Sequence, residues 1–320
     1  MTTTAHGAGV VTLGETMALV ASTSFGPLQH TRTMNLGIGG SESNMAIALS
    51  RLGTPVTWIG KVGADSLGDL VVREIGAEGV RVVAPRDAEA PTALMVKEYR
   101  TSVDTHVWYY RKNNAGSRLR TDEVDPDLIR NAALLHVTGI SPALSDTMAH
   151  TVDEAIRIAK EAGTIVSFDL NFRGKLWSRE TARETYLRLI PLADIVFAGD
   201  DEAAIAVGAA DTPLELAHRL VDAGAGQAIV KLGARGAVAV VDGIDYERAA
   251  IKVPAIDTVG AGDAFVAGYL ADLLLGADVP TRLTTAVTVG AYACLTTGDW
   301  EGTPRRHELA LLGGAEPVSR

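Results

Sequence analysis

The chain has 320 residues, of which 47% are hydrophobic and 21% charged, a composition that excludes an intrinsically disordered protein. Its 29 Lys and Arg residues against 39 Asp and Glu residues give a formal net charge of −10. This acidic balance, without a basic run, argues against a general binder of nucleic acid or membrane surfaces. A small anionic ligand remains compatible with it, because a site can be locally positive on an acidic protein.

The sequence also indicates the compartment. Its single cysteine, Cys294, excludes an intrachain disulfide, so nothing suggests an oxidising environment. The first basic residue is Arg32, which argues against a signal peptide, and no apolar run approaches the ~18–20 residues of a membrane span. We therefore expect a cytoplasmic protein whose partners are small molecules.

The predicted elements alternate between strand and helix. Short apolar runs predict strands, and apolar side chains at helical spacing, such as Met45, Leu49 and Leu52 before Gly53, predict helices. The predicted strands cover 10–13, 56–60, 134–137, 164–169, 194–197 and 228–232, and the predicted helices cover 41–52, 67–75, 146–160, 214–223, 263–275 and 282–296. This alternation predicts an α/β fold with a mostly parallel central sheet and helices on both faces.

Two segments interrupt the alternation. Residues 28–38 and 92–111 are strand-like without an intervening helix, and the second is rich in β-forming residues such as Val107, Trp108 and Tyr109. They could pair into a small antiparallel sheet, either a lid over a site or an ordinary edge hairpin. Because no repeat or linker divides the chain, the simpler interpretation is one domain from which these two segments project as an excursion.

The segment DTVGAGDAF, residues 257–265, places a Gly260-x-Gly262 turn directly before a predicted helix. Glycines at a helix N-terminus let the backbone approach an anion, which free N–H groups and the helix dipole stabilise. Asp263 follows in the first turn, where a carboxylate beside an anion could accept the proton of an attacking hydroxyl. The alternative is an ordinary helix-capping aspartate.

Other phosphate-binding motifs are absent from the sequence. No G-x-x-x-x-G-K-S/T run occurs, which excludes a P-loop. The near matches to G-x-G-x-x-G have Ile229 or Phe265 where the third glycine belongs, so a dinucleotide-binding dehydrogenase is poorly supported.

A second glycine-containing turn opens the first long helix with the run GGSESN, residues 39–44. Paired glycines permit close backbone approach, and the amide of Asn44 can both donate to and accept from sugar hydroxyls. Taken alone, this run is equally compatible with an ordinary turn before a helix.

Together the two segments resemble the signatures of the ribokinase-like (PfkB) family of carbohydrate kinases. Residues 39–44, continuing through Gly53 and Gly63, fit the N-terminal signature, and residues 257–263 fit the C-terminal one. The resemblance implies a ribokinase-like three-layer α/β/α domain over 9–315. It also implies a small β-sheet lid formed by excursions at about 16–38 and 91–112, with flexible tails at 1–8 and 316–320.

The resemblance also implies roles for individual residues. Asp263 would be the base on the sugar hydroxyl, and the amides of Gly260, Ala261 and Gly262 would stabilise the transferring phosphoryl group. The expected sugar contacts at the first turn are Gly39, Gly40 and Asn44. The expected nucleotide-side residues are Asn171, Lys231, Gly233, Gly236, Gly260 and Gly262.

The expected cofactors are ATP and Mg²⁺, because phosphoryl transfer depends on positioning and charge neutralisation. The family's Asn-x-x-Glu motif, linked to Mg²⁺, reads Gly199-Asp200-Asp201-Glu202 here, so Glu202 matches and glycine replaces the asparagine. Asp200 could compensate or cap a helix. The region of Asp257 resembles the family's monovalent-cation loop, which makes K⁺ a further candidate.

Two arginines suggest the substrate. Tyr109-Tyr110-Arg111 closes the second excursion, and Arg173 lies in the run DLNFRGKLW that begins at Asp169. An arginine fork suits bidentate binding of a carboxylate, although Arg111 could be a solvated strand residue and Arg173 a structural ion-pair partner.

The combination of these two runs resembles 2-keto-3-deoxygluconate kinases, which implies that Tyr109, Arg111 and Arg173 contact a sugar acid. The second run also occurs in fructokinases, and residues 92–96 lack an aromatic residue often found there in keto-acid kinases.

The sequence therefore predicts ATP-dependent phosphorylation of a sugar hydroxyl, with 2-dehydro-3-deoxy-D-gluconate converted to its 6-phosphate. A fructokinase or ribokinase-type activity on a neutral sugar is the alternative. A catalytically silent sugar sensor on the same fold is the alternative from another class. Because unpaired edge strands tend to associate, a homodimer through the lid is also expected.

Overall fold

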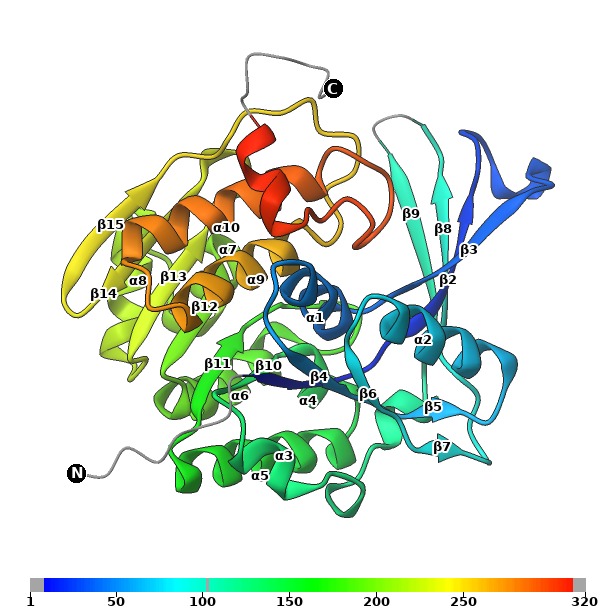
Figure 1. Ribbon diagram of the computed structural model, residues 1–320, viewed down its shortest axis with the longest axis horizontal. Helices are drawn as coiled ribbons and strands as arrows, with labels where there is room; N and C mark the ends of the chain where they lie inside the picture. The colour runs from blue at the N-terminus through cyan, green and yellow to red at the C-terminus, as the bar shows by residue number, and fades with distance from the viewer. Residues whose placement is uncertain (1–8, 102–103, 313–320) are drawn as a thin grey trace.

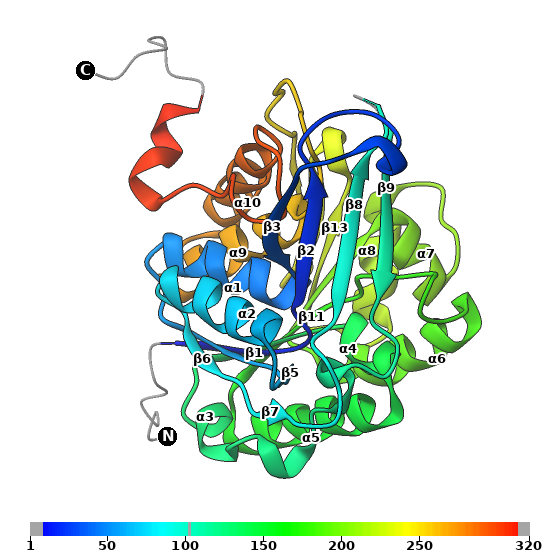
Figure 2. The same ribbon diagram turned by 90° about the vertical axis from the view of Figure 1, so that its right-hand side faces the viewer.

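The computed structural model describes residues 9–101 and 104–312, so the tails expected at 1–8 and 316–320 lie outside the described residues. A large sheet with helices on both faces forms the body, and a smaller sheet projects from one end of it (Figures 1 and 2).

The large sheet contains nine strands within the described ranges. In spatial order they are β15 (Ile244–Arg248), β14 (Ala237–Val241), β13 (Gln227–Lys231), β12 (Ile195–Gly199), β11 (Ile165–Asp169), β10 (Leu134–Thr138), β1 (Val10–Leu13), β4 (Val56–Ile59) and β6 (Arg81–Val83). All neighbouring pairs from β6 to β13 are parallel, and β13, β14 and β15 pair antiparallel. The mostly parallel sheet predicted from the alternation is confirmed.

Helices cover both faces of this sheet. One layer contains α1 (Ser41–Arg51), α2 (Ser66–Ala77), α9 (Ala261–Leu274) and α10 (Val279–Ala293). The other contains α3 (Pro126–Arg130), α4 (Ile140–Leu144), α5 (Asp146–Ala162), α6 (Arg179–Leu189), α7 (Asp200–Val207) and α8 (Pro213–Asp222). Successive strand side chains point to opposite faces, so Val196 and Ala198 enter one core while Ile195 and Phe197 enter the other. The result is the predicted three-layer α/β/α arrangement.

The smaller sheet has the order β3 (Met34–Gly39), β2 (Met17–Ser22), β8 (Leu94–Tyr99) and β9 (Thr105–Tyr110). It differs from the predicted antiparallel sheet, because its two central strands, β2 and β8, pair parallel. Strands β2 and β8 both run outward from the body, so they pair parallel to each other. Strands β3 and β9 run back toward the body and pair antiparallel to them. The strand expected over 28–38 begins only at Met34, since Leu28–His30 forms a 3₁₀ turn. The short strands β5 (Val62–Gly63) and β7 (Arg86–Asp87) pair separately.

The two faces of the smaller sheet differ. Met17, Leu19 and Met95 are buried on one face. Leu36, Trp108 and Tyr110 are exposed. Lys97 is buried with Asp257 and Asp299, so the small sheet contacts the body near the start of α9.

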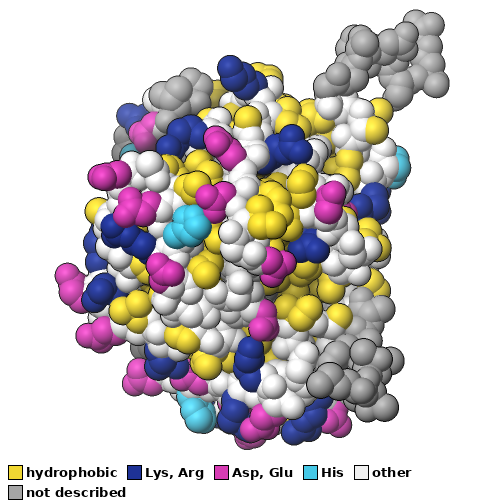
Figure 3. Space-filling view, turned by 90° about the vertical axis from the view of Figure 1, so that its left-hand side faces the viewer, with side chains coloured by type: hydrophobic (Ala, Val, Ile, Leu, Met, Phe, Trp, Pro, Cys, Tyr) yellow, Lys and Arg dark blue, Asp and Glu magenta, His cyan; other side chains and the backbone are white. Residues whose placement is uncertain are grey.

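Charged side chains are dispersed on the molecular face that Figure 3 shows. Lys and Arg side chains are interspersed there with Asp and Glu side chains, and they form no basic patch on that face. In the described part of the chain, no helix is both long and apolar enough to cross a membrane.

Candidate active site

Polar residues gather where the parallel strands end. Thr138 ends β10, Asp169 ends β11, Lys231 ends β13, and Glu15 follows β1 by two residues. Ligands of open parallel sheets bind at this carboxyl edge. Helices α1 and α9 begin at the same edge, which places their free N–H groups beside these side chains.

Asp263 lies at the centre of this edge, where its side chain is bound by two residues of α1. Ser41 Oγ donates to one carboxylate oxygen at 2.6 Å, and Asn44 Nδ2 donates to the other at 2.9 Å. Asn171 Nδ2 donates to Ser41 Oγ at 2.6 Å. The structure thus brings together Asp263, Asn44 and Asn171, three residues expected from the sequence. It adds Ser41, which the sequence analysis did not single out. Its position in the GGSESN run was the signal that could have identified it.

The turn before Asp263 requires glycine. Gly260 caps α9 with φ = +76°, and a Cβ there would lie 1.7 Å from the backbone oxygen of Asp299. At the first turn, Gly40 is extended, and a Cβ would lie 2.5 Å from the backbone oxygen of Glu15. A Cβ at Gly39 would overlap the side chains of Met95 and Asp299. Gly39 and Gly40 therefore allow close packing of backbone segments around the site.

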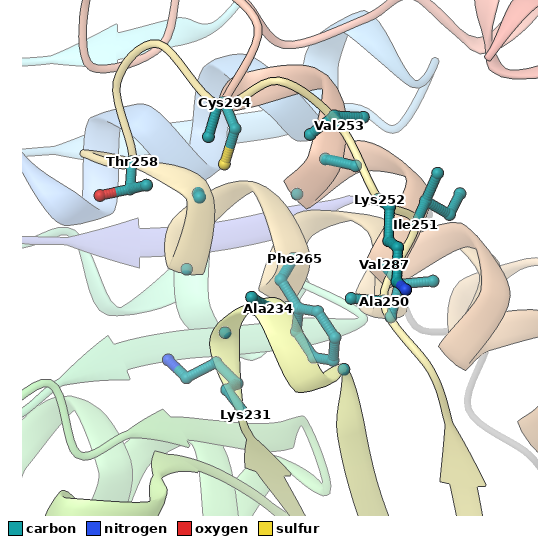
Figure 4. A pocket seen from close by; sticks show the side chains of 17 residues that line it. Lys231, Ala234, Ala250, Ile251, Lys252, Val253, Thr258, Phe265, Val287 and Cys294 are labelled. Atoms are coloured by element: carbon teal, nitrogen blue, oxygen red, sulfur yellow. The ribbon is translucent and has the colours of Figure 1, made fainter. Parts of the chain in front are cut away.

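A cavity of about 580 Å³ lies on one side of the Gly260 turn (Figure 4). Lys231, Gly233, Gly236 and Gly262 line it, together with apolar side chains such as Phe265. Its lining also includes Ala234, Ala250, Ile251, Lys252, Val253, Ala255, Thr258, Ala261, Val287, Gly290, Ala291 and Cys294. A concave, mostly apolar space beside free amides and an ammonium suits a flat base with an anionic tail.

Lys231 provides a fixed cation in the lining of this cavity. Its Nζ is 2.6 Å from Asp169 Oδ2 and would be 3.7 Å from a Cβ at Gly262. Burial by itself lowers the pKa of Lys231, but the nearby carboxylates, first Asp169 and then Glu202, outweigh it and raise that pKa. The side chain is therefore an ammonium beside the amides of the Gly260 turn.

A second cavity, of about 970 Å³, contains the expected substrate residues. Tyr109, Arg111 and Arg173 all line it, although they come from β9, from the residue that follows β9 and from the segment after β11. Arg111 Cζ is 5.7 Å, and Lys175 Nζ 5.4 Å, from the centroid of the Tyr109 ring. Cations this close to an aromatic ring favour its face. The structure thus assembles these three residues in one positively charged hollow.

Arg111 has a partner that the sequence analysis missed. Its Nη2 is 2.5 Å from Glu15 Oε2, and the Glu15 side chain is fully buried. Burial raises the pKa of the Glu15 carboxyl, while the Arg111 guanidinium opposes that shift. A carboxylate two residues after a buried strand was the signal available in the sequence. Arg111 is therefore neither a solvated strand residue nor an unpaired cation.

Glu202, the expected magnesium residue, binds two backbone amides. Its Oε1 accepts from Phe172 N at 2.9 Å and its Oε2 from Gly199 N at 2.7 Å. These bonds fix the segment that carries Asn171 and Arg173. Asp200 forms an ion pair with Arg235. Over 9–101 and 104–312, no group of three or more His, Cys, Asp or Glu side chains could hold a metal ion by itself.

Asp257, the expected monovalent-cation residue, already has a cation. Lys97 Nζ is 2.6 Å from its Oδ2, and Val259 N donates to its Oδ1 at 3.1 Å. Burial opposes the charge of Lys97, but the carboxylates, Asp299 foremost, raise its pKa. Because the Lys97 ammonium already neutralises this carboxylate, it would repel a separate K⁺ ion at the same oxygens.

Glu42, in the first turn of α1, is a buried acid near Asp263. Its Oε1 accepts from Thr138 Oγ1 at 2.7 Å and from Ser141 Oγ at 2.9 Å. A Cβ at Gly14 would lie 2.2 Å from its carboxyl carbon, so Gly14 leaves the space that Glu42 fills. Burial, against the two hydroxyl bonds, raises the pKa of Glu42 from 4.5 to about 7.

Replacing Glu42 by Gln is expected to change how stability depends on pH. Between pH 4.5 and about 7 the folded chain retains a proton on Glu42 that the unfolded chain releases, so this group lowers stability as pH rises. The Gln variant lacks the effect. Its melting temperature relative to wild type should rise from pH 4.5 to about 7 and level off above. A difference that does not vary with pH would contradict the prediction.

The chain is similar to known proteins over nearly its whole length. A family model described as pfkB family carbohydrate kinase matches residues 8–306. A 2-dehydro-3-deoxygluconokinase of Bacillus subtilis strain 168 is 37% identical over 317 residues, which are 96% of this chain and 95% of that protein. A 2-dehydro-3-deoxygalactonokinase of Haloferax volcanii is 34% identical, over 98% of this chain and 99% of that one. A structure described as a ribokinase II of E. coli with ATP and Mg²⁺ superimposes with a TM-score of 0.89 at 26% identity, covering 95% and 98%.

Proposed function

The chain belongs to the pfkB family of carbohydrate kinases, and from this premise we propose that it transfers the γ-phosphoryl group of ATP to the 6-hydroxyl of 2-dehydro-3-deoxy-D-gluconate. The observation that carries the proposal is Asp263, held by Ser41 and Asn44 directly after the Gly260 turn. Relatives named for 2-dehydro-3-deoxy sugar acids, aligned over nearly the whole chain, support the substrate class.

In the proposed reaction Asp263 accepts the proton of the sugar hydroxyl. The hydroxyl oxygen then bonds to the γ-phosphorus as the bond from that phosphorus to the leaving oxygen of ADP breaks. The amides of Gly260, Ala261 and Gly262 would donate to the phosphoryl oxygens, that of Ala261 in place of its 3.3 Å bond to the Thr258 carbonyl, with Lys231 as the nearby cation. Closure of the small sheet over the sugar, as a lid, would exclude water from the site.

ATP and Mg²⁺ fit the residues of this edge. The apolar cavity that Gly233 and Gly236 line would hold the base, and a Cβ at Gly233 would meet no atom within 4 Å. Mg²⁺ bound with the nucleotide would neutralise phosphate charge, with Glu202 as the acid that the family resemblance implies. Since the Glu202 oxygens already accept from amides, phosphates and waters would supply most of the ligands. A Cβ at position 199 would lie 3.4 Å from Glu202 Oε2, an ordinary contact distance.

The sugar would occupy the second cavity. Arg111 and Arg173 would bind the carboxylate of the substrate, and Tyr109 would pack against the sugar chain. Gly39, Gly40 and Asn44 would contact the hydroxyls nearest Asp263, and Asn171 would lie between sugar and phosphates.

A neutral sugar is the second candidate, and the ion pair between Glu15 and Arg111 favours it. An arginine that is already neutralised attracts a carboxylate less strongly. The silent sensor is disfavoured, because the presence of both Asp263 and the Gly260 turn supports the proposed reaction.

A substrate panel tests the proposal. ADP release is measured with 2-dehydro-3-deoxygluconate, its galactonate epimer, fructose and ribose, all with Mg²⁺-ATP. We expect kcat/KM to be highest for a 2-dehydro-3-deoxy sugar acid. A higher value for fructose or ribose would select the neutral-sugar alternative, and sugar binding without turnover would select the sensor.

Three further expectations stay predictions. A homodimer is supported by the exposed Leu36, Trp108 and Tyr110 of the small sheet, and a mass measurement in solution would test it. A cytoplasmic location rests on the sequence alone. Activation by K⁺ at Asp257 is the third expectation, and the Lys97 ammonium on the same carboxylate argues against it.

A further inference from the structure

A buried cluster of charges joins the small sheet to the body. It consists of Lys97 on β8, Asp257 before α9, and Asp299 after α10, and we call it the Lys97 cluster. Lys97 Nζ is 2.6 Å from Asp257 Oδ2 and 3.3 Å from Asp299 Oδ1. The three side chains are 2%, 9% and 7% exposed. The Tyr99 ring centroid lies 5.5 Å from the ammonium, and the Tyr99 hydroxyl is 3.4 Å from Asp257 Oδ2.

Asp257 and Asp299 both belong to segments that contact the Gly260 turn. Asp257 Oδ1 accepts from Val259 N, and the Thr258 carbonyl accepts from Ala261 N at 3.3 Å. On the other side, the backbone oxygen of Asp299 lies where a Cβ of Gly260 would be. Lys97 therefore holds the two segments that fix the conformation of the turn.

We propose that the Lys97 ammonium is a permanent cation beside the Gly260 turn. It takes the place of a free monovalent ion at Asp257. It acts as a positioning residue, because it holds the amides that receive phosphoryl charge without contacting substrate. Since Lys97 belongs to the small sheet, the same contact makes the conformation of the turn depend on the position of that sheet. The inference rests on the proposed function.

Removing the ammonium would leave two buried carboxylates without their shared cation. An unpaired buried charge is costly, so the space vacated by a shortened side chain should recruit a small cation from solvent. The wild-type protein, with its own ammonium, should show no such requirement.

The test compares Lys97→Ala with Lys97→Met, which fills the space with an uncharged chain of similar length. Buffers contain tetramethylammonium chloride, which is too large for the space, or the same ionic strength of KCl or NH₄Cl. In tetramethylammonium we expect both variants to lose at least about tenfold in kcat, with a smaller change in sugar KM. K⁺ or NH₄⁺ should restore most of the kcat of Lys97→Ala, but not of Lys97→Met, and wild type should stay within about twofold in every salt.

Lys61→Ala is the matched control. Lys61 is also buried between two carboxylates, at 2.7 Å from Glu123 and 3.6 Å from Asp87, but it lies outside the proposed site. Its variant should show no salt-specific recovery of kcat. Wild-type dependence on K⁺, or an impaired Lys97→Ala that no small cation rescues, would overturn the inference.

Thermal unfolding separates this inference from the proposed function. K⁺ or NH₄⁺ should raise the melting temperature of Lys97→Ala above its value in tetramethylammonium, since a bound ion stabilises the folded state, and should not raise that of wild type. If Lys97→Ala folds only in K⁺ or NH₄⁺, folding yield gives the same answer. This readout needs no sugar, so it decides the inference even if wild type phosphorylates none of the sugars tested.

Discussion

Replacing Asp263 by Asn is expected to lower kcat by about 10³-fold while the protein still folds and binds its sugar. The amide has nearly the same shape as the carboxylate, so its oxygen can still accept a hydrogen bond from Ser41 or Asn44, which hold Asp263 now. It has no site for the proton of the sugar hydroxyl. The loss should therefore appear in kcat, measured as ADP release, with a small change in the sugar Kd measured by calorimetry.

Ser41→Ala provides the control for this variant. It removes the hydroxyl that links Asp263 to Asn171 but keeps the carboxylate. We expect a loss of about tenfold, well below that of the Asn variant, because orientation is impaired while the base remains. If Asp263→Asn turned over at a rate close to wild type, Asp263 would not be the base. Equal losses in both variants would assign Asp263 a purely structural role.

Local patterns in the sequence predicted much of the fold. Strand and helix periods identified the parallel strands β1, β4, β10, β11, β12 and β13, and glycines identified the two turns at the site. The hairpin of β14 and β15 was missed, although Asp242-Gly243 joins its strands with both residues at positive φ, a typical hairpin signal. The parallel pairing of β2 with β8 had no such signal, because it depends on where both strands leave the body.

The residues missed at the site pair over long sequence distances. Glu15 pairs with Arg111 behind the cavity lining, and Lys97 with an aspartate 160 positions later. No local period encodes either contact. Asp263 and Asn44 are as distant in sequence, yet they could be predicted together because each lies in a glycine-containing run of its own. A functional pair can thus be predicted from a sequence when each of its two residues lies in a recognisable local motif.

Three cations in and beside the site, Lys97 buried and the other two largely so, share one arrangement. Lys231 pairs with Asp169, Arg111 with Glu15, and Lys97 with Asp257. Each is held in place by a carboxylate, so their positions are fixed before any ligand arrives. An acidic protein can therefore bind an anionic sugar and a nucleotide with oriented amides and paired cations, and needs no net positive charge.

The ion pair of Arg111 decides how its role in substrate choice can be tested. Arg111→Ala alone would leave Glu15 buried without a partner, which costs roughly 3–5 kcal/mol and would lower activity on every sugar. The informative variant is the double substitution Glu15→Gln with Arg111→Met, which removes both charges and keeps similar volumes. Glu15→Gln alone is the matched control, because it retains the arginine and frees it from its carboxylate.

In the double variant we expect kcat/KM for the sugar acid to fall about 10- to 150-fold relative to Glu15→Gln. This corresponds to loss of a charged hydrogen bond of roughly 1.5–3 kcal/mol. The value for fructose or ribose should change by less than about threefold, because a neutral sugar has no carboxylate for Arg111 to bind. Equal losses on acidic and neutral sugars would show that Arg111 shapes the cavity without recognising a carboxylate. Recognition of the acid would then depend on Arg173, the other arginine of the same cavity.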